Sequence, residues 1–164
     1  MARLDKENYY LDIAQTVSER CTCLRRKYGA IIVQNDEIVA TGYNGAPRGR
    51  KNCVDLGHCL RDDLSIPSGE RYELCRSVHA EANAIISAPR RDMIGATLYL
   101  TCCNGKTNEL MSDNTSCSMC RRLIINAGIT RVVCRTSAEE YTITHVRDWI
   151  FGDDSVSASV ESSR

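Results

Sequence analysis

The stretch "SVHAEANAII" (residues 77–86) places His79 and Glu81 two positions apart at the start of an otherwise apolar, helix-forming segment. Buried helices rarely accept two ionisable side chains unless a charged partner compensates for the loss of water. A metal ion and a reacting substrate are the two kinds of partner that this pattern indicates. The remaining ligands of such a site must then come from elsewhere in the chain.

A second motif, "SCSMC" (116–120), supplies two cysteines at the start of another predicted helix. Cys117 and Cys120 are three residues apart, so both sulfurs can lie on one helical face and reach the same ion. The positive end of a helix also favours the thiolate, which is the form that binds metals. Together with His79 they make three protein ligands, the number typical of a catalytic zinc site with an open fourth position. Glu81 is then expected beside the ion as the group that carries protons.

The composition limits the class of protein. Lys and Arg number 21 and Asp and Glu also number 21, and this balance argues against a protein whose main task is to bind nucleic acid. No apolar run is long enough to span a membrane, and the first ten residues lack the pattern of a signal peptide. We therefore expect a cytoplasmic protein with no membrane partner, in which the ten cysteines bind metal or are buried instead of forming disulfides.

The order of predicted elements indicates the fold class. Helices are predicted over 6–23, 78–88 and 117–127, and strands over 28–34, 37–43, 96–101 and 131–135. This order predicts an α/β fold, a three-layer α-β-α sandwich in which a mixed sheet of four to five strands has helices on both faces. The length predicts one domain, residues 1–151, followed by a disordered tail, 152–164.

Residues 141–151 fit either a strand or a helical turn, and "YTITHV" alternates as a strand does. A strand there follows the preceding one after only "TSAEE", and a parallel crossover needs about a dozen residues. A fifth strand is therefore either antiparallel or outside the sheet.

Several longer stretches resemble the cytidine and deoxycytidylate deaminase superfamily. They run in the order that the family has and cover most of residues 10–135: "CLRRKYGAIIV", "ATGYNGAPRG", "HAEANAI", "GATLYLT" and "CRRLIINAGITRVV". The "GYNGAPRG" stretch is most similar to the deoxycytidylate (dCMP) deaminase branch. The resemblance implies zinc-dependent hydrolytic deamination of dCMP to dUMP and ammonia, which would supply dUMP for thymidylate synthesis.

The resemblance also implies roles for individual residues. His79, Cys117 and Cys120 would bind the catalytic zinc, and Glu81 would be the proton shuttle. Asn44 would contact the sugar, and the backbone at Ala80 would contact the pyrimidine oxygen. Family members are commonly homo-oligomers, and many respond to dCTP and dTTP as allosteric effectors.

The substrate phosphate needs cations, and arginines and lysines gather around both ends of the predicted hairpin. Arg26 and Arg48 are our candidates for phosphate ligands, because arginine makes two-pronged contacts with phosphate. Two alternatives stay open at this stage. The chain could deaminate another cytosine compound (a nucleoside, the free base or a base in RNA), or it could be a non-catalytic module that binds zinc or nucleotides.

The sequence departs from the family pattern in two places near the second motif. Ser116 stands where the family usually has proline, and we expect its hydroxyl to cap the following helix. The segment 102–115 is much longer than the family's usual crossing from strand to helix. It either covers the site or contacts a neighbouring subunit, or it is a surface insertion that the fold tolerates.

Four further cysteines bracket a long aperiodic region, and some deoxycytidylate deaminases carry a second, structural zinc in the matching region. The hypothesis is a closed tetrahedral zinc site with His58 in reserve; the alternative is packed or exposed free thiols. The four candidate ligands are Cys23, Cys53, Cys59 and Cys75.

Overall fold

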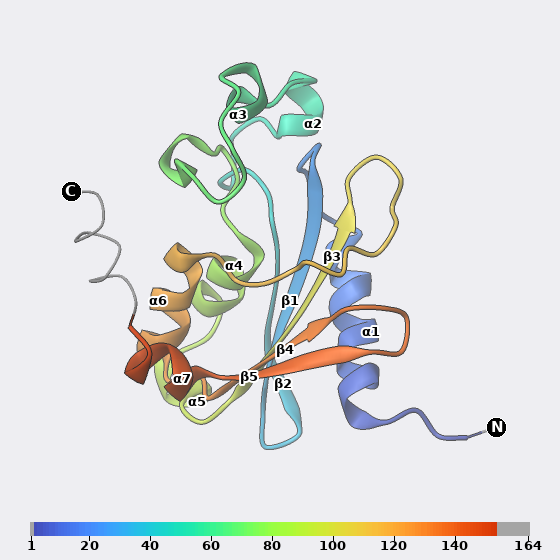
Figure 1. The fold of residues 1–164 in the computed structure, drawn as a ribbon, viewed down its shortest axis with the longest axis vertical. Helices are drawn as coiled ribbons and strands as arrows, with labels where there is room; N and C mark the ends of the chain where they lie inside the picture. Colours follow the sequence, from blue (N-terminus) through green and yellow to red (C-terminus); the bar gives the residue numbers. More distant parts are fainter. Residues whose placement is uncertain (1, 154–164) are drawn as a thin grey trace.

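A five-stranded mixed sheet forms the centre of the protein (Figure 1), which is described here from a computed structural model covering residues 2–153. The strand order is β2-β1-β3-β4-β5; β3 and β4 are parallel, and every other neighbouring pair is antiparallel. The strands are β1 (Arg26–Gln34), β2 (Glu37–Tyr43), β3 (Thr97–Asn104), β4 (Arg131–Arg135) and β5 (Tyr141–His145). The predicted fold class is confirmed, and the fifth strand is antiparallel. Most of the predicted disordered tail, from residue 154 on, lies outside the described residues.

Helices cover both faces of this sheet. On one face lies α1 (Lys6–Ser18) alone, and a group of four helices covers the other face (Figure 1). The four are α4 (Ala80–Ile86), α5 (Arg90–Met93), α6 (Ser118–Ala127) and α7 (Val146–Phe151). The short helices α2 (Cys53–Leu56) and α3 (Leu60–Asp63) and the 3₁₀ turn η1 (Tyr72–Leu74) belong to a lobe at one end of the sheet. Within residues 2–153, no helix has both the length and the apolar character that crossing a bilayer requires.

Strand β1 is buried on both faces, and its side chains alternate between two cores. Ala30 and Ile32 pack in the core beneath α4 and α6, whereas Ile31 and Val33 pack against α1. This alternation is the two-residue period of a strand. It explains why the stretch reads as a continuous apolar run, and it fixes the register of this strand, which lies between β2 and β3.

A tight turn and a glycine shape the β1–β2 hairpin, on which α4 packs. Asn35 and Asp36 both have positive φ, 50° and 65°, and so form the predicted tight hairpin turn between β1 and β2. Further along β2, a Cβ on Gly42 would lie 2.3 Å from the carbonyl oxygen of Ala80 and 2.4 Å from the backbone nitrogen of Ala84. Only glycine therefore allows α4 to approach the strand this closely.

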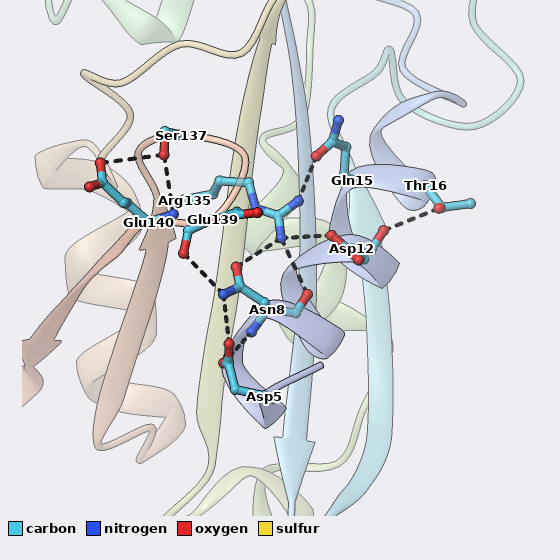
Figure 2. A network of polar contacts seen from close by, with 9 residues as sticks. All are labelled: Asp5, Asn8, Asp12, Gln15, Thr16, Arg135, Ser137, Glu139 and Glu140. Atoms are coloured by element: carbon cyan, nitrogen blue, oxygen red, sulfur yellow. Dashed lines mark hydrogen bonds and ion pairs between the residues drawn. The ribbon is translucent and has the colours of Figure 1, made fainter. Parts of the chain in front are cut away.

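A buried arginine ties α1 to the end of β4 (Figure 2). The Arg135 guanidinium donates to Gln15 Oε1 at 2.8 Å and to both Asn8 oxygens at 3.2 Å, and it pairs with Asp12 at 2.7 Å. The Asn8 amide in turn donates to the carbonyl of Glu139 at 3.0 Å. Through this network the first helix is fixed to the turn between the last two strands.

Three predicted boundaries differ from the structure. The first helix ends at Ser18, not at residue 23, because residues 19–25 turn the chain back into β1. Strand β3 continues to Asn104, because it pairs with β1 along its whole length, up to Asn104 opposite Arg26. The segment 53–63, expected to be a loop, contains α2 and α3.

The predicted cap at Ser116 is wrong. Cys117 is the N-cap of α6, and its sulfur accepts a hydrogen bond from the backbone nitrogen of Cys120. Ser116 is buried one position earlier, and its hydroxyl has no hydrogen-bond partner among residues 2–153. The thiol at position 117 thus takes the role that the hydroxyl was expected to have.

Candidate metal centre and active site

The three predicted zinc ligands converge at the starts of two neighbouring helices. His79 is the N-cap of α4, Cys117 is the N-cap of α6, and Cys120 lies in the first turn of α6. Nδ1 of His79 is 3.5 Å from Sγ of Cys117 and 3.4 Å from Sγ of Cys120. All three ligand atoms lie within 4.8 Å of one another, and no other group of three or more such residues in the described part of the chain meets this criterion.

These distances fit a zinc ion. Zn–S bonds of about 2.3 Å and a Zn–N bond of about 2.05 Å, separated by a tetrahedral angle, place sulfur and nitrogen about 3.5 Å apart. The observed separations of 3.5 Å and 3.4 Å agree with this value. One nitrogen and two sulfurs also match the ligand chemistry that zinc prefers, and three ligands leave one position open.

The charges at the three candidate ligands are those of a metal-free site: Cys117 is easier to ionise than usual, whereas Cys120 and His79 hold their protons more tightly. Hydrogen bonding with Cys120, reinforced by His79, lowers the pKa of Cys117 to about 4, so this group is a thiolate at neutral pH. Burial by itself lowers the pKa of His79, but hydrogen bonds with Cys117 and Cys75 outweigh it and raise the pKa to about 10. In the metal-free site the Cys117 sulfur therefore faces a protonated imidazole, and His79 must release its proton before it can bind a metal ion.

Glu81 lies in the first turn of α4 and is 3% exposed. Burial raises the pKa of its carboxyl, while the neighbouring His79 lowers it. A carboxyl group that is harder to ionise than usual suits proton transfer near neutral pH. The geometry therefore places a proton-carrying group beside the candidate metal site, as the H-A-E motif predicts.

A cavity of about 280 Å³ opens over this site. His79, Ala80, Glu81 and Cys117 line it, as does Asn44 at the end of β2. The Asn44 amide is already engaged, because it accepts from the backbone nitrogen of Tyr28 at 2.8 Å and donates to the carbonyl of Arg26 at 2.9 Å. These two bonds fix its orientation at the cavity wall, where the sugar contact is predicted.

Four arginines also line the cavity: Arg25, Arg26, Arg61 and Arg76. Arg26 was predicted as a phosphate ligand, and its position is compatible with that role. Arg48, the other candidate, is not among the residues that line the cavity.

The four cysteines of the hypothetical second site all line the same cavity. Burial raises the pKa of Cys53, and the nearby Cys23 and Cys75 raise it further, so these thiols lie close enough to interact. No three of them meet the 4.8 Å criterion among the described residues. His58, the reserve ligand, lies 2.6 Å from Oδ2 of Asp63 and does not line the cavity.

The model of the family described as "Cytidine and deoxycytidylate deaminase zinc-binding region" matches residues 4–136, which is most of the chain. The chain belongs to this family. The family's zinc-binding region and the His79, Cys117 and Cys120 donor set together identify zinc as the metal.

Similar proteins carry consistent names. A deoxycytidylate deaminase of Mycobacterium phage D29 is 38% identical over 137 residues, covering 81% of this chain and 96% of that protein. A deoxycytidylate deaminase of Schizosaccharomyces pombe is 33% identical; the match covers 80% of this chain but only 37% of the yeast protein. A solved structure of the dCMP deaminase from cyanophage S-TIM5, in complex with dCMP and dUMP, is 28% identical with a TM-score of 0.54 and covers 81% of this chain and 84% of that one.

The sequence did not reveal the residues that pack against the His79 ring. The Tyr72 ring contacts the His79 ring edge-on with 4.8 Å between centroids, and the Arg61 guanidinium lies 4.6 Å from the centre of the Tyr72 ring. Arg61 is itself buried and donates to the carbonyls of Pro67 and Glu70. The available signal was proximity in sequence, because Tyr72 precedes the H-A-E motif by only seven residues.

Proposed function

We propose that this protein catalyses the zinc-dependent hydrolytic deamination of dCMP to dUMP and ammonia. The observation that carries the proposal is the set of His79, Cys117 and Cys120 with Glu81 beside it, in one cavity that arginines also line. The names of the similar phage and yeast proteins support the substrate. The site residues given below are part of the proposal.

Each residue has one task in this reaction. His79, Cys117 and Cys120 hold the zinc, which supplies a nucleophile at neutral pH by making water far more acidic. The Glu81 carboxylate takes a proton from the attacking water and delivers it to N3 while oxygen adds to C4 of the cytosine. Glu81 then takes the proton of the new C4 hydroxyl and passes it to the C4 amino group. The C4–N bond breaks, ammonia leaves and the C4 carbonyl forms, so one group acts first as base and then as acid.

The substrate is bound by the residues along the cavity wall. We assign the phosphate to Arg26, the sugar to Asn44 and the pyrimidine oxygen to the backbone nitrogen of Ala80, which begins α4. An arginine suits the phosphate because its planar fork can donate two hydrogen bonds at once. Arg48 remains a predicted phosphate ligand only, because it is not among the residues that line the cavity.

The proposal also includes a second zinc ion, bound by four cysteines. Cys23, Cys53, Cys59 and Cys75 all line the cavity, and the other three cysteines raise the pKa of Cys53, which supports ligation of an ion by these four. Metal analysis of fully loaded protein is expected to give two zinc ions per chain. One zinc ion per chain in active protein would rule out this second site.

The assembly and regulation that the family resemblance implies are proposals as well. Residues 1–151 are proposed to form one domain and to assemble as a homo-oligomer, with dCTP and dTTP as effectors. Exposed apolar side chains on the helices opposite α1 support assembly: Ile86, Leu123, Ile150 and Phe151 are 40–87% exposed. Size measurement in solution, with and without each nucleotide, tests both points.

The decisive experiment measures ammonia release by the zinc-loaded protein from dCMP, deoxycytidine, CMP and cytosine in parallel. Turnover of dCMP above the other three is expected. The Glu81→Ala variant should lose at least about a hundredfold in kcat, the usual minimum for a lost acid–base group, and should keep its zinc. Equal turnover of deoxycytidine would make a nucleoside the substrate. Turnover unaffected by Glu81→Ala would remove Glu81 from the mechanism, and no turnover of any of the four compounds by the wild type would leave only a binding module.

A further inference from the structure

The long segment between β3 and α6 reaches the cavity. Asp113 and Thr115 from this segment are among the residues that line it, together with His79 and Glu81. Covering the site is one of the roles predicted for this segment, and the structure places its Asp113 and Thr115 end at the cavity wall. The segment therefore contributes a charged side chain at the place where substrate is proposed to bind.

Asp113 forms an ion pair with the proposed phosphate ligand. Its Oδ2 is 3.4 Å from Nη2 of Arg26, whose Nη1 in turn donates to the Tyr28 hydroxyl at 3.4 Å. Among residues 2–153, Asp113 and Glu81 are the only carboxylates that line the cavity. Because Glu81 is assigned to proton transfer, Asp113 is the one negative charge in the cavity that the reaction leaves unexplained.

The chain next to Asp113 is anchored by hydrogen bonds, whereas the side chain of Asp113 is mostly exposed. The neighbouring Asn114 is buried, and its amide donates to the carbonyls of Met111 and Arg135. Met111 also donates its backbone N–H to the carbonyl of Cys102 at 2.9 Å. In contrast, the side chain of Asp113 is 64% exposed, so it can rotate into solvent without disturbing these bonds.

The pair is weak enough to be exchanged. Both partners are partly exposed, at 31% and 64%, and their separation of 3.4 Å is long for a charge-assisted hydrogen bond. A phosphate dianion carries more charge than a carboxylate and accepts two donors from one guanidinium. It would therefore displace Asp113 from Arg26, whereas a neutral nucleoside brings no group that competes for the arginine.

We propose that Asp113 is a specificity residue that competes with the substrate phosphate for Arg26 and so reduces the preference for nucleotides over nucleosides. This rests on the proposed function, because it takes Arg26 as the phosphate ligand. An Asp113→Asn variant removes the competing charge at almost unchanged size. Its kcat/KM for dCMP should rise about two- to fivefold, the range that exchange of an exposed ion pair allows, mainly through a lower KM. Its kcat/KM for deoxycytidine should stay within about 1.5-fold of the wild-type value, because no phosphate is involved.

The test compares kcat/KM for dCMP and deoxycytidine in the wild type, Asp113→Asn and a matched control. Asp92→Asn is the control, since it removes the same charge from an exposed pair with Arg91 on α5. The ratio of the two kcat/KM values should rise in Asp113→Asn alone. A double variant, Asp113→Asn with Arg26→Gln, should have the same ratio as Arg26→Gln alone. Without Arg26, Asp113 and the phosphate have no guanidinium to compete for.

The outcomes separate this inference from the function on which it rests. Wild-type turnover of dCMP with an unchanged ratio in Asp113→Asn would overturn the inference and leave deamination standing. A change of equal size for both substrates would do the same, because it would indicate that Asp113 only supports the loop. Failure of the wild type to deaminate dCMP would overturn the proposed function, and the inference with it.

Discussion

Replacing Arg135 with alanine should destabilise the protein without touching the cavity over the metal site. Arg135 is 3% exposed and donates to Gln15 and to two oxygens of Asn8, and it pairs with Asp12 (Figure 2). The alanine variant leaves the buried Asn8 oxygens without their donor. It also removes the link between α1 and the end of β4.

The size of the effect follows from burial. A hydrogen bond to a charged group contributes about 1.5–3 kcal/mol, but the four contacts do not add, because water can replace some of them. Asp12 has a 56% exposed side chain and regains its hydration when the arginine is gone, so its pairing contributes little. The remaining contacts to Asn8 and Gln15 predict a loss of about 2–3 kcal/mol in the free energy of unfolding.

Guanidinium chloride unfolding of the zinc-loaded protein, followed by far-UV circular dichroism at fixed protein concentration, measures this loss. With a slope of about 4 kcal/mol/M for a chain of this size, the midpoint should fall by about 0.5–0.75 M. Arg147→Ala is the control, because Arg147 is 75% exposed and its pair with Asp148 is 3.9 Å long; its midpoint should hardly move. If both variants lost less than about 0.5 kcal/mol, the reasoning from burial would be refuted.

Three further predictions concern the helix that carries the site, the metal and a buried tyrosine. Gly42→Ala should lower kcat at least about tenfold, because its Cβ would meet the Ala80 carbonyl at 2.3 Å and displace α4; unchanged kinetics would contradict this close approach. Removing zinc with a chelator should lower the melting temperature, and adding zinc should restore it, because an ion that binds only the folded chain stabilises it. Finally, hydrogen bonding to Asp36 and burial raise the pKa of Tyr10 from 10.0 to about 12. The unfolded chain therefore ionises first, and wild-type stability should fall between pH 10 and pH 12 by more than that of Tyr10→Phe; parallel unfolding curves would count against it.

The layers of the fold could be predicted from sequence because they follow from local patterns. Alternation in β1 and the Asn35–Asp36 turn determine the hairpin, and a glycine after α6 determines where that helix ends. The convergence of the three candidate metal ligands could be predicted for the same reason. His79 and Cys117 each begin a helix, and the backbone geometry there depends on a few neighbouring residues.

The surroundings of the site could not be predicted, because they depend on contacts between distant residues. Ser116 and Cys117 are adjacent and each can cap a helix, so the sequence did not decide between them; in the structure Cys117 caps α6. Charge alone likewise could not separate Arg26 from Arg48. Both are arginines near the hairpin, but only Arg26 lies on the strand that borders the cavity.

The bonds between Asn8 and Arg135 join residues 127 positions apart, and this separation bears on how the chain folds as it is made. Residues 6–18 leave the ribosome early, yet the side chain that fixes α1 to β4 is synthesised only when most of the domain is complete. Early α1 thus has an apolar face that meets β1 and β3 before the bonds to Arg135 exist. During synthesis the first helix is held by this apolar contact and by polar contacts with the β1–β2 turn, such as that of Tyr10 with Asp36. The bonds to Arg135 form in a late, long-range step.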